Sequence, residues 1–281
     1  MSDIKGMTFM NARIAQEQRL AKLVEAFKAD SGQYETIETP EDDEGRKRLL
    51  RSLMNIRQPG DMIDEVLQLQ NDYLKARVEE KGIVTLTDIP PMEEGLSLWQ
   101  GDITRLAVDA IVNAANSQML GCFVPLHACI DNCIHTFSGI QLRNECHRQM
   151  QNLRHRYGED YEQPTAVPML TDGYNLPAKK VIHIVGPIIS GKLTPRLEKA
   201  LADCYTNSLA MCMENGLRSV AFCCISTGVF HFPQERAAQI AFSHVKQWLA
   251  AHGGVIDRVI FNVFTEKDRD IYEKIFRQSS R

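Results

Sequence analysis

The sequence lacks several features that would assign it to a specialised class of protein. Among its 281 residues, no apolar run approaches the roughly 20 residues that a transmembrane helix needs. The 32 basic and 36 acidic residues leave a net charge of −4, which argues against bulk nucleic-acid binding. The first residues carry neither the basic nor the apolar stretch of a signal peptide. We therefore expect a cytoplasmic protein without nucleic-acid or membrane partners.

Two nucleotide-binding motifs are missing as well. The chain contains neither the GxGxxG fingerprint nor a P-loop, which argues against a nicotinamide-dependent dehydrogenase or a kinase. There is no internal repeat and no low-complexity tract. With 44% hydrophobic and 24% charged residues, the composition is that of a globular protein with a full core.

Cysteine is absent from the first 121 residues, yet eight cysteines follow. In a cytoplasmic protein of this size they are not expected to form a disulfide framework. Three of them lie between Cys122 and Cys133, a clustering that indicates metal or redox chemistry. Because no CxxC motif is present, the redox interpretation is the weaker one.

The pattern of predicted secondary structure changes near residue 83. Residues 1–82 carry three apolar stripes at helical spacing and predict an N-terminal helical extension whose role is packing. Residues 83–91 predict an extended linker. In 83–281, strand-like and helix-like runs alternate, which indicates an α/β domain with a mainly parallel sheet covered on both faces. The predicted strands are 96–99, 110–113, 166–170, 181–185, 220–225 and 259–263, and the predicted helices are 139–153, 195–215, 233–251 and 267–278.

Ligand sites in such folds lie at the carboxyl ends of the strands, where this chain places several polar residues. Asp102 directly follows a predicted strand and can accept a hydrogen bond from a ligand, or cap a turn. Another strand delivers Asn113 and Asn116, whose amides suit ribose hydroxyls or close a turn. A third strand runs into a turn at Ser226 and Gly228, where successive backbone N–H groups can bind phosphate.

Cys122, His127 and Cys129 are spaced Cys-x4-His-x-Cys. Thiolate and imidazole both suit zinc, and three protein ligands leave the fourth position open, which is the catalytic pattern. A helix over residues 127–135 would instead bring His127, Asp131 and His135 to one face. The thiols can also be small buried apolar groups or a redox sensor, and the spacing leaves these alternatives open.

Taken together, these segments resemble the macrodomain family over about residues 84–278. The resemblance implies a three-layer α/β/α fold with a mixed, mainly parallel sheet that binds ADP-ribose. In many members it also implies hydrolysis of ADP-ribose from modified proteins. The matching segments, in the family's order, are 101–104, 108–116, 164–166, 176–187 and 225–230.

The loop at 121–135 narrows the resemblance to the zinc-dependent macrodomains of microbes. It contains Cys-Phe-x-Pro-x-His-x-Cys-Ile-Asp-Asn where the common hydrolases have a glycine-rich loop. That branch carries an N-terminal helical extension and removes mono-ADP-ribose from protein side chains. Some members accompany a sirtuin-type ADP-ribosyltransferase and a lipoylated carrier protein of the glycine-cleavage type. The resemblance therefore implies one Zn²⁺ per chain on Cys122, His127 and Cys129, an ADP-ribosylated protein as substrate, and such a carrier as a partner.

The resemblance also implies a role for each site residue. Asp102 would hold the adenine amine, Asn116 would lie nearest the distal ribose, and Phe230 would cover that ribose. His231 has no implied role, and it can simply cap the following helix. The implied catalytic residues are Asn116, Cys122, His127 and Cys129, and the implied ADP-ribose-binding residues are Asp102, Ile103, Asn113, Asn116, Ser226, Thr227, Gly228, Val229 and Phe230.

The implied reaction is hydrolysis at the anomeric carbon of the distal ribose, with a carboxylate of the modified protein as the leaving group. Zinc could polarise a substrate oxygen, or bind water and lower its pKa toward about 7. Asp131 is a candidate hydrogen-bond partner for His127. The alternative is a non-catalytic ADP-ribose reader with a structural zinc, which a fourth ligand such as Cys133 or His135 would favour.

Overall fold

Runs of aliphatic residues form a central sheet in the computed structural model, which describes residues 2–279. Adjacent residues Ile111 and Val112 point to opposite faces and are both fully buried, so both faces are covered. Neighbouring strands are parallel except β5, which runs antiparallel to β6. The predicted mixed, mainly parallel sheet is thus confirmed. In sheet order, the strands are β2 (Leu96–Gln100), β8 (Arg258–Val263), β7 (Ser219–Phe222), β4 (Ala110–Ala115), β6 (Lys180–Val185) and β5 (Met169–Asp172).

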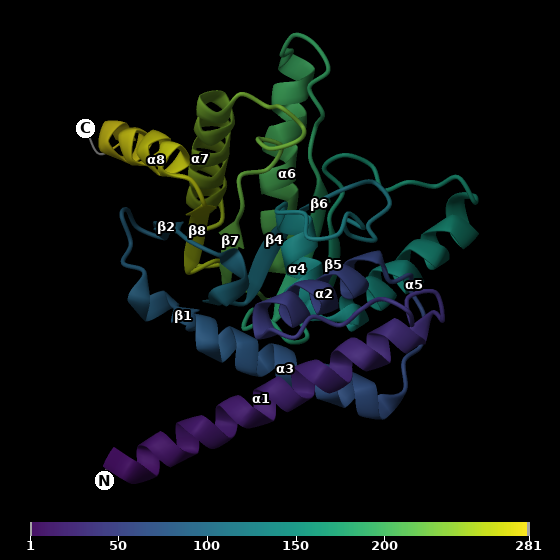
Figure 1. The fold of residues 1–281 in the computed structure, drawn as a ribbon. Helices are drawn as coiled ribbons and strands as arrows, with labels where there is room; N and C mark the ends of the chain where they lie inside the picture. The colour runs from purple at the N-terminus through teal and green to yellow at the C-terminus, as the bar shows by residue number, and fades with distance from the viewer. Residues whose placement is uncertain (1, 280–281) are drawn as a thin grey trace.

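Helices cover the sheet on both sides and give three layers (Figure 1). On one face, the ring of Tyr205 lies 5.0 Å from that of Phe222 on β7, measured between centroids. The rings of Phe242 and Tyr272 both pack on Phe261 of β8. This face is therefore closed by an aromatic core. Its helices are α6 (Pro195–Glu214), α7 (Gln234–Ala251) and α8 (Glu266–Ser279), and the opposite face carries α4 (Ile130–Ser138) and α5 (Ile140–Tyr157).

The N-terminal extension is helical, as predicted, and has a core of its own. It consists of α1 (Ser2–Asp30), α2 (Asp43–Ile56) and α3 (Asp64–Lys81). Buried Leu23, Leu53 and Leu74, one from each helix, belong to this core, and Ile140 of α5 completes it. Figure 1 shows the three helices on the side of α4 and α5. Because α5 supplies part of their core, the extension is packed against the α/β portion; the boundary at residue 83 stays a prediction.

The predicted linker after α3 is wrong in part, because residues 84–85 pair with another strand and residues 86–88 form a 3-10 turn. The short strand β1 (Val84–Thr85) pairs in parallel with β3 (Leu106–Ala107), and a 3-10 turn, η1 (Leu86–Asp88), follows it. Two-residue strands leave no periodicity in the sequence to detect. Among the described residues, no helix has both the length and the apolar character that crossing a membrane requires.

Two predicted strands have different bounds in the structure. The strand predicted at 166–170 is found at Met169–Asp172 as β5, because Ala166 has a φ of 63° and cannot continue an extended strand. The strand predicted at 220–225 ends at Phe222, from which the chain leaves the sheet toward Ser226.

The sequence indicates a helix at α4 only through the alternative metal set, and the structure explains where this helix begins. The Cys129 sulfur accepts a hydrogen bond from the Asn132 N–H at 3.5 Å and caps the helix. Gly139, with a φ of 97°, ends it. Cysteine is an uncommon cap residue, so the sequence carries no strong start signal here. The helix that follows, predicted at 139–153, extends to Tyr157.

Candidate active site

A cavity of about 1090 Å³ lies at the carboxyl ends of the strands. β2, β4 and β7 each end at its wall, as expected for parallel sheets. Helices α2 and α3 add Arg51 and Lys81, which the sequence gave no reason to expect there. Of the predicted site residues, all but Asn113 line the cavity: Asp102, Ile103, Asn116, Cys122, His127, Cys129, Ser226, Thr227, Gly228, Val229 and Phe230.

Asp102 stands at one end of the cavity, directly after β2. Its Oδ1 accepts hydrogen bonds from the Thr104 backbone N–H at 3.0 Å and from the Thr104 hydroxyl at 2.6 Å. Its Oδ2 lies 2.9 Å from Lys81 Nζ. Burial raises the pKa of Asp102, but the Thr104 hydrogen bonds and the Lys81 charge outweigh burial, so the pKa lies below its ordinary value. Asp102 is therefore an ionised acceptor at neutral pH.

Asn113 lies beneath the cavity, not on its wall. Its side chain is fully buried, and its Nδ2 donates to Asp131 Oδ1 at 2.8 Å. It also lies 3.1 Å from Nδ1 of His183, whose pKa burial lowers to about 3, so that the imidazole is neutral. Asn113 thus supports the floor of the cavity through Asp131.

Asn116 links the end of β4 to the cysteine-bearing loop. Its Oδ1 accepts from the Gln118 N–H at 3.0 Å, while its Nδ2 donates to the Gly121 carbonyl at 3.2 Å. The second oxygen of Asp131 lies 3.4 Å from the same Nδ2. Burial raises the pKa of Asp131 to about 6, opposed by the hydrogen bond from Asn113. Asp131 therefore bridges Asn113 and Asn116, and not His127 as the sequence suggested.

The turn after β7 forms the opposite wall. Ser226 has a φ of 66°, and its buried hydroxyl has no hydrogen-bond partner among the described residues. A Cβ on Gly186 would come within 2.1 Å of that hydroxyl, so only glycine fits there. A Cβ on Gly228 would meet nothing within 4 Å, so the turn is open on that side. An orphaned donor beside an exposed turn suits an anionic ligand.

Cys122, His127 and Cys129 converge at the cavity wall near Asn116. The Cys122 sulfur lies 3.6 Å from His127 Nδ1, and the three ligand atoms lie within 4.8 Å of one another. Burial raises the pKa of Cys129 to about 12, so a thiolate at Cys129 needs a nearby cation. This soft donor set fits zinc, whose binding would supply that charge.

Comparison with known proteins decides the family. The Macro domain profile matches residues 112–241. A protein-ADP-ribose hydrolase from Treponema medium is 46% identical over 266 residues, covering 93% of this chain and 99% of that protein. The chain belongs to the macrodomain family.

A second relative and a solved structure agree with this assignment. A protein-ADP-ribose hydrolase from Staphylococcus aureus (strain MRSA252) is 37% identical over 268 residues, covering 95% of this chain and 98% of that protein. The crystal structure of a Trypanosoma brucei macrodomain in complex with ADP-ribose superposes with a TM-score of 0.61 and 29% identity. That alignment covers 80% of this chain and 94% of the other chain.

The alternative metal set is not assembled in this macrodomain. Helix α4 begins at Ile130, so His127 lies outside it. His135 instead forms a fully buried group with Cys146 and His183 beneath the cavity. Neither Cys133 nor His135 joins the cluster of Cys122, His127 and Cys129 among the described residues. The cluster therefore has three protein donors there, the pattern of an open site.

His231 does not cap α7. The cap position is Pro233, which makes no side-chain capping hydrogen bond. His231 itself is exposed and has a φ of 58°, at the end of the Ser226 turn. The alternative role suggested by the sequence is therefore wrong.

The orphaned Ser226 hydroxyl leads to a prediction about the diphosphate wall. Ser226→Ala should weaken ADP-ribose binding roughly ten- to a hundredfold, because it removes one hydrogen-bond donor to the charged diphosphate, worth about 1.5–3 kcal/mol. Titration calorimetry with ADP-ribose and with adenosine checks the assignment. Adenosine, which has no diphosphate, should bind the variant and the parent equally. An equal loss for both ligands would contradict it.

Proposed function

We propose that this macrodomain is a zinc-dependent hydrolase that acts in the cytoplasm and removes mono-ADP-ribose from carboxylate side chains of modified proteins. One observation carries the proposal. A single cavity of about 1090 Å³ is lined by an ionised acceptor, an open turn whose buried Ser226 hydroxyl has no partner among the described residues, and three donors placed so that they could hold a metal ion. The two bacterial relatives support it. Both are protein-ADP-ribose hydrolases, and both align with this chain over nearly their whole length.

The cavity residues would bind ADP-ribose from end to end. Asp102 would accept a hydrogen bond from the adenine amine, with the Ile103 backbone beside it. The turn from Ser226 to Phe230 would hold the diphosphate, and Phe230 would cover the distal ribose. Asn116, fixed by Gly121 and Asp131, would orient the ribose hydroxyls. Such positioning is itself a large part of catalysis, because it removes the entropy cost of aligning the reactants.

Hydrolysis would break the bond between the anomeric carbon and the carboxylate oxygen. The oxygen of water adds to that carbon, and its proton goes to the departing carboxylate, which yields free ADP-ribose and a carboxylic acid. Cys122, His127 and Cys129 would hold the zinc, which when bound supplies a Lewis acid at the reacting end. Thiolates of Cys122 and Cys129 would donate charge to the metal and weaken its Lewis acidity, so positioning of the ribose by Asn116 would contribute alongside polarisation.

A reader of ADP-ribose with a structural zinc is the second candidate. A structural site normally fills all four positions with protein ligands. The cluster here offers three among the described residues, which favours the hydrolase.

The test uses a panel of mono-ADP-ribosylated proteins. In each protein the ADP-ribose is attached to one type of side chain: aspartate or glutamate, arginine, or serine. We expect release of free ADP-ribose from the carboxylate-linked substrates. The first substrate to try is a lipoylated carrier of the glycine-cleavage type modified by a sirtuin-type transferase, which the resemblance to the zinc branch suggests. Binding of ADP-ribose without release from any substrate would support the reader instead.

A further inference from the structure

Two side chains of α2 reach the loop that carries the proposed zinc ligands. Asn55 Oδ1 accepts a hydrogen bond from the Leu126 backbone N–H at 3.0 Å. Arg51 Nη2 donates to the carbonyl of His127 at 2.8 Å. The extension therefore holds the backbone on both sides of the only histidine in the cluster.

The loop needs this support at Leu126. That residue has a φ of 58°, a conformation that costs a branched side chain energy and persists only where neighbours impose it. Asn55 is 1% exposed, so its amide oxygen is shielded from bulk water. Without it, the Leu126 N–H loses its partner in a strained turn directly before His127.

Arg51 also acts through Asn132, which is fully buried at the start of α4. Arg51 Nη2 donates to Asn132 Oδ1 at 2.8 Å, which orients the amide. Asn132 Nδ2 then donates to the Cys122 carbonyl at 3.2 Å. The Asn132 backbone N–H lies 3.5 Å from the Cys129 sulfur. Arg51 thus contacts His127 directly and is connected through Asn132 to the backbone of Cys122 and to the sulfur of Cys129.

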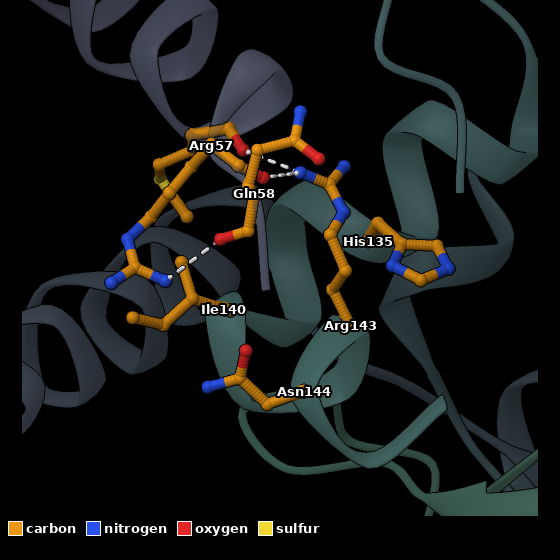
Figure 2. Close-up of a pocket in the computed structure, with 8 residues that line it drawn as sticks. Arg57, Gln58, His135, Ile140, Arg143 and Asn144 are labelled. Carbon is orange, nitrogen blue, oxygen red and sulfur yellow. Dashed lines mark hydrogen bonds between the residues drawn. The ribbon is translucent and has the colours of Figure 1, made fainter. Parts of the chain in front are cut away.

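Arg143 of α5 fixes α2 relative to this loop. Its Nη1 donates to three carbonyls at the end of α2, those of Met54, Asn55 and Arg57. These carbonyls lack helical partners because the helix ends there. Its Nε donates to the Leu120 carbonyl at 2.8 Å, just before the loop. Figure 2 shows Arg143 reaching from α5 to the backbone at Arg57.

We infer that α2 contributes to the active site, and that Arg51 and Asn55 are positioning residues that hold the three zinc ligands in place before zinc binds. The inference rests on the proposed zinc-dependent hydrolysis. Neither residue needs to touch zinc. Partners that orient metal ligands typically contribute about 10- to 100-fold to metal affinity. The N-terminal extension then has a function beyond packing.

The test compares the full-length parent with Arg51→Ala and Asn55→Leu. Zinc affinity is measured by competition with a chromophoric chelator, and ligand geometry by the absorption spectrum of the Co²⁺-substituted protein. We expect zinc affinity to fall about 10- to 100-fold and the Co²⁺ bands to shift. At subsaturating zinc, kcat should fall while KM and ADP-ribose affinity stay within about twofold. Because Asn55→Leu can impair folding, Arg51→Ala gives an independent answer at a half-buried position.

Two control variants separate positioning from general damage. Arg48→Ala removes an exposed arginine from the same helix. Asn144→Ala removes two hydrogen bonds between α5 and Gly60, away from the loop. Both should bind zinc like the parent.

Three results would overturn the inference. Unchanged zinc affinity and Co²⁺ spectrum in Arg51→Ala and Asn55→Leu would overturn it while leaving the hydrolase proposal intact. Weaker ADP-ribose binding by Arg51→Ala with unchanged zinc affinity would make Arg51 a direct ligand contact instead. If the parent protein binds no zinc, that result contradicts both the proposed function and the inference.

Discussion

Replacing His127 or Cys129 by alanine should abolish release of ADP-ribose while ADP-ribose binding survives. The two side chains belong to the three-donor cluster, and their loss leaves too few ligands for zinc. Metal stabilisation of a transition state is worth several kcal/mol, so turnover should fall about a thousandfold or more. The adenine and diphosphate contacts at Asp102 and Ser226 lie elsewhere on the cavity wall. Parallel hydrolysis assays and titration calorimetry measure both effects.

Cys133→Ala is the matched control for this prediction. Cys133 also lines the cavity, but it lies outside the metal cluster, with its sulfur 3.6 Å from Arg51 Nη2. Its replacement should leave turnover and zinc content nearly unchanged. Unchanged turnover in His127→Ala or Cys129→Ala would refute a role for the metal in catalysis.

Asp102→Ala should weaken ADP-ribose binding by about 1.5–3 kcal/mol, or roughly ten- to a hundredfold. This is the typical contribution of a hydrogen bond to a charged acceptor. The substitution also removes the partner of Lys81, whose ammonium lies 2.9 Å from Asp102 Oδ2 and 3.2 Å from the Phe137 ring centroid. Lys81→Met therefore serves as a control for loss of the Lys81 charge, which removes the ion pair and the Phe137 contact but keeps the Asp102 carboxylate.

An analogue of ADP-ribose with hypoxanthine in place of adenine makes this test specific. The analogue has a carbonyl where adenine has its amine, so it offers Asp102 no donor at that position. Calorimetry should show that Asp102→Ala loses affinity for ADP-ribose but not for the analogue. If Asp102→Ala binds ADP-ribose with the affinity of the parent, Asp102 does not contact the adenine.

Much of the fold follows from local patterns in the sequence. Apolar runs predict the strands of the central sheet, because a buried parallel strand has to be apolar on both faces. The misses all depend on contacts distant in sequence or on unusual local geometry. β1 exists only because it pairs with β3. The shifted start of β5 follows from the left-handed backbone of Ala166.

The site could be predicted where side chains follow directly from a strand end, as Asp102 and Ser226 do. Asn113 and Asn116 both carry amides, but Asn113 is still inside β4 and points below the cavity toward Asp131. Lys81 reaches the cavity from α3 in the extension. Its place depends on how the helices dock, which apolar periodicity does not determine.

The most direct test of zinc-dependent hydrolysis strips the metal and restores it. Purified protein is treated with a chelator until metal analysis detects no zinc, then assayed on a carboxylate-linked mono-ADP-ribosylated protein before and after zinc is returned. We expect release of ADP-ribose to stop, ADP-ribose binding to persist, and release to resume with zinc. Release at the original rate from zinc-free protein would contradict the account, because the cluster of Cys122, His127 and Cys129 would then play no part in the reaction.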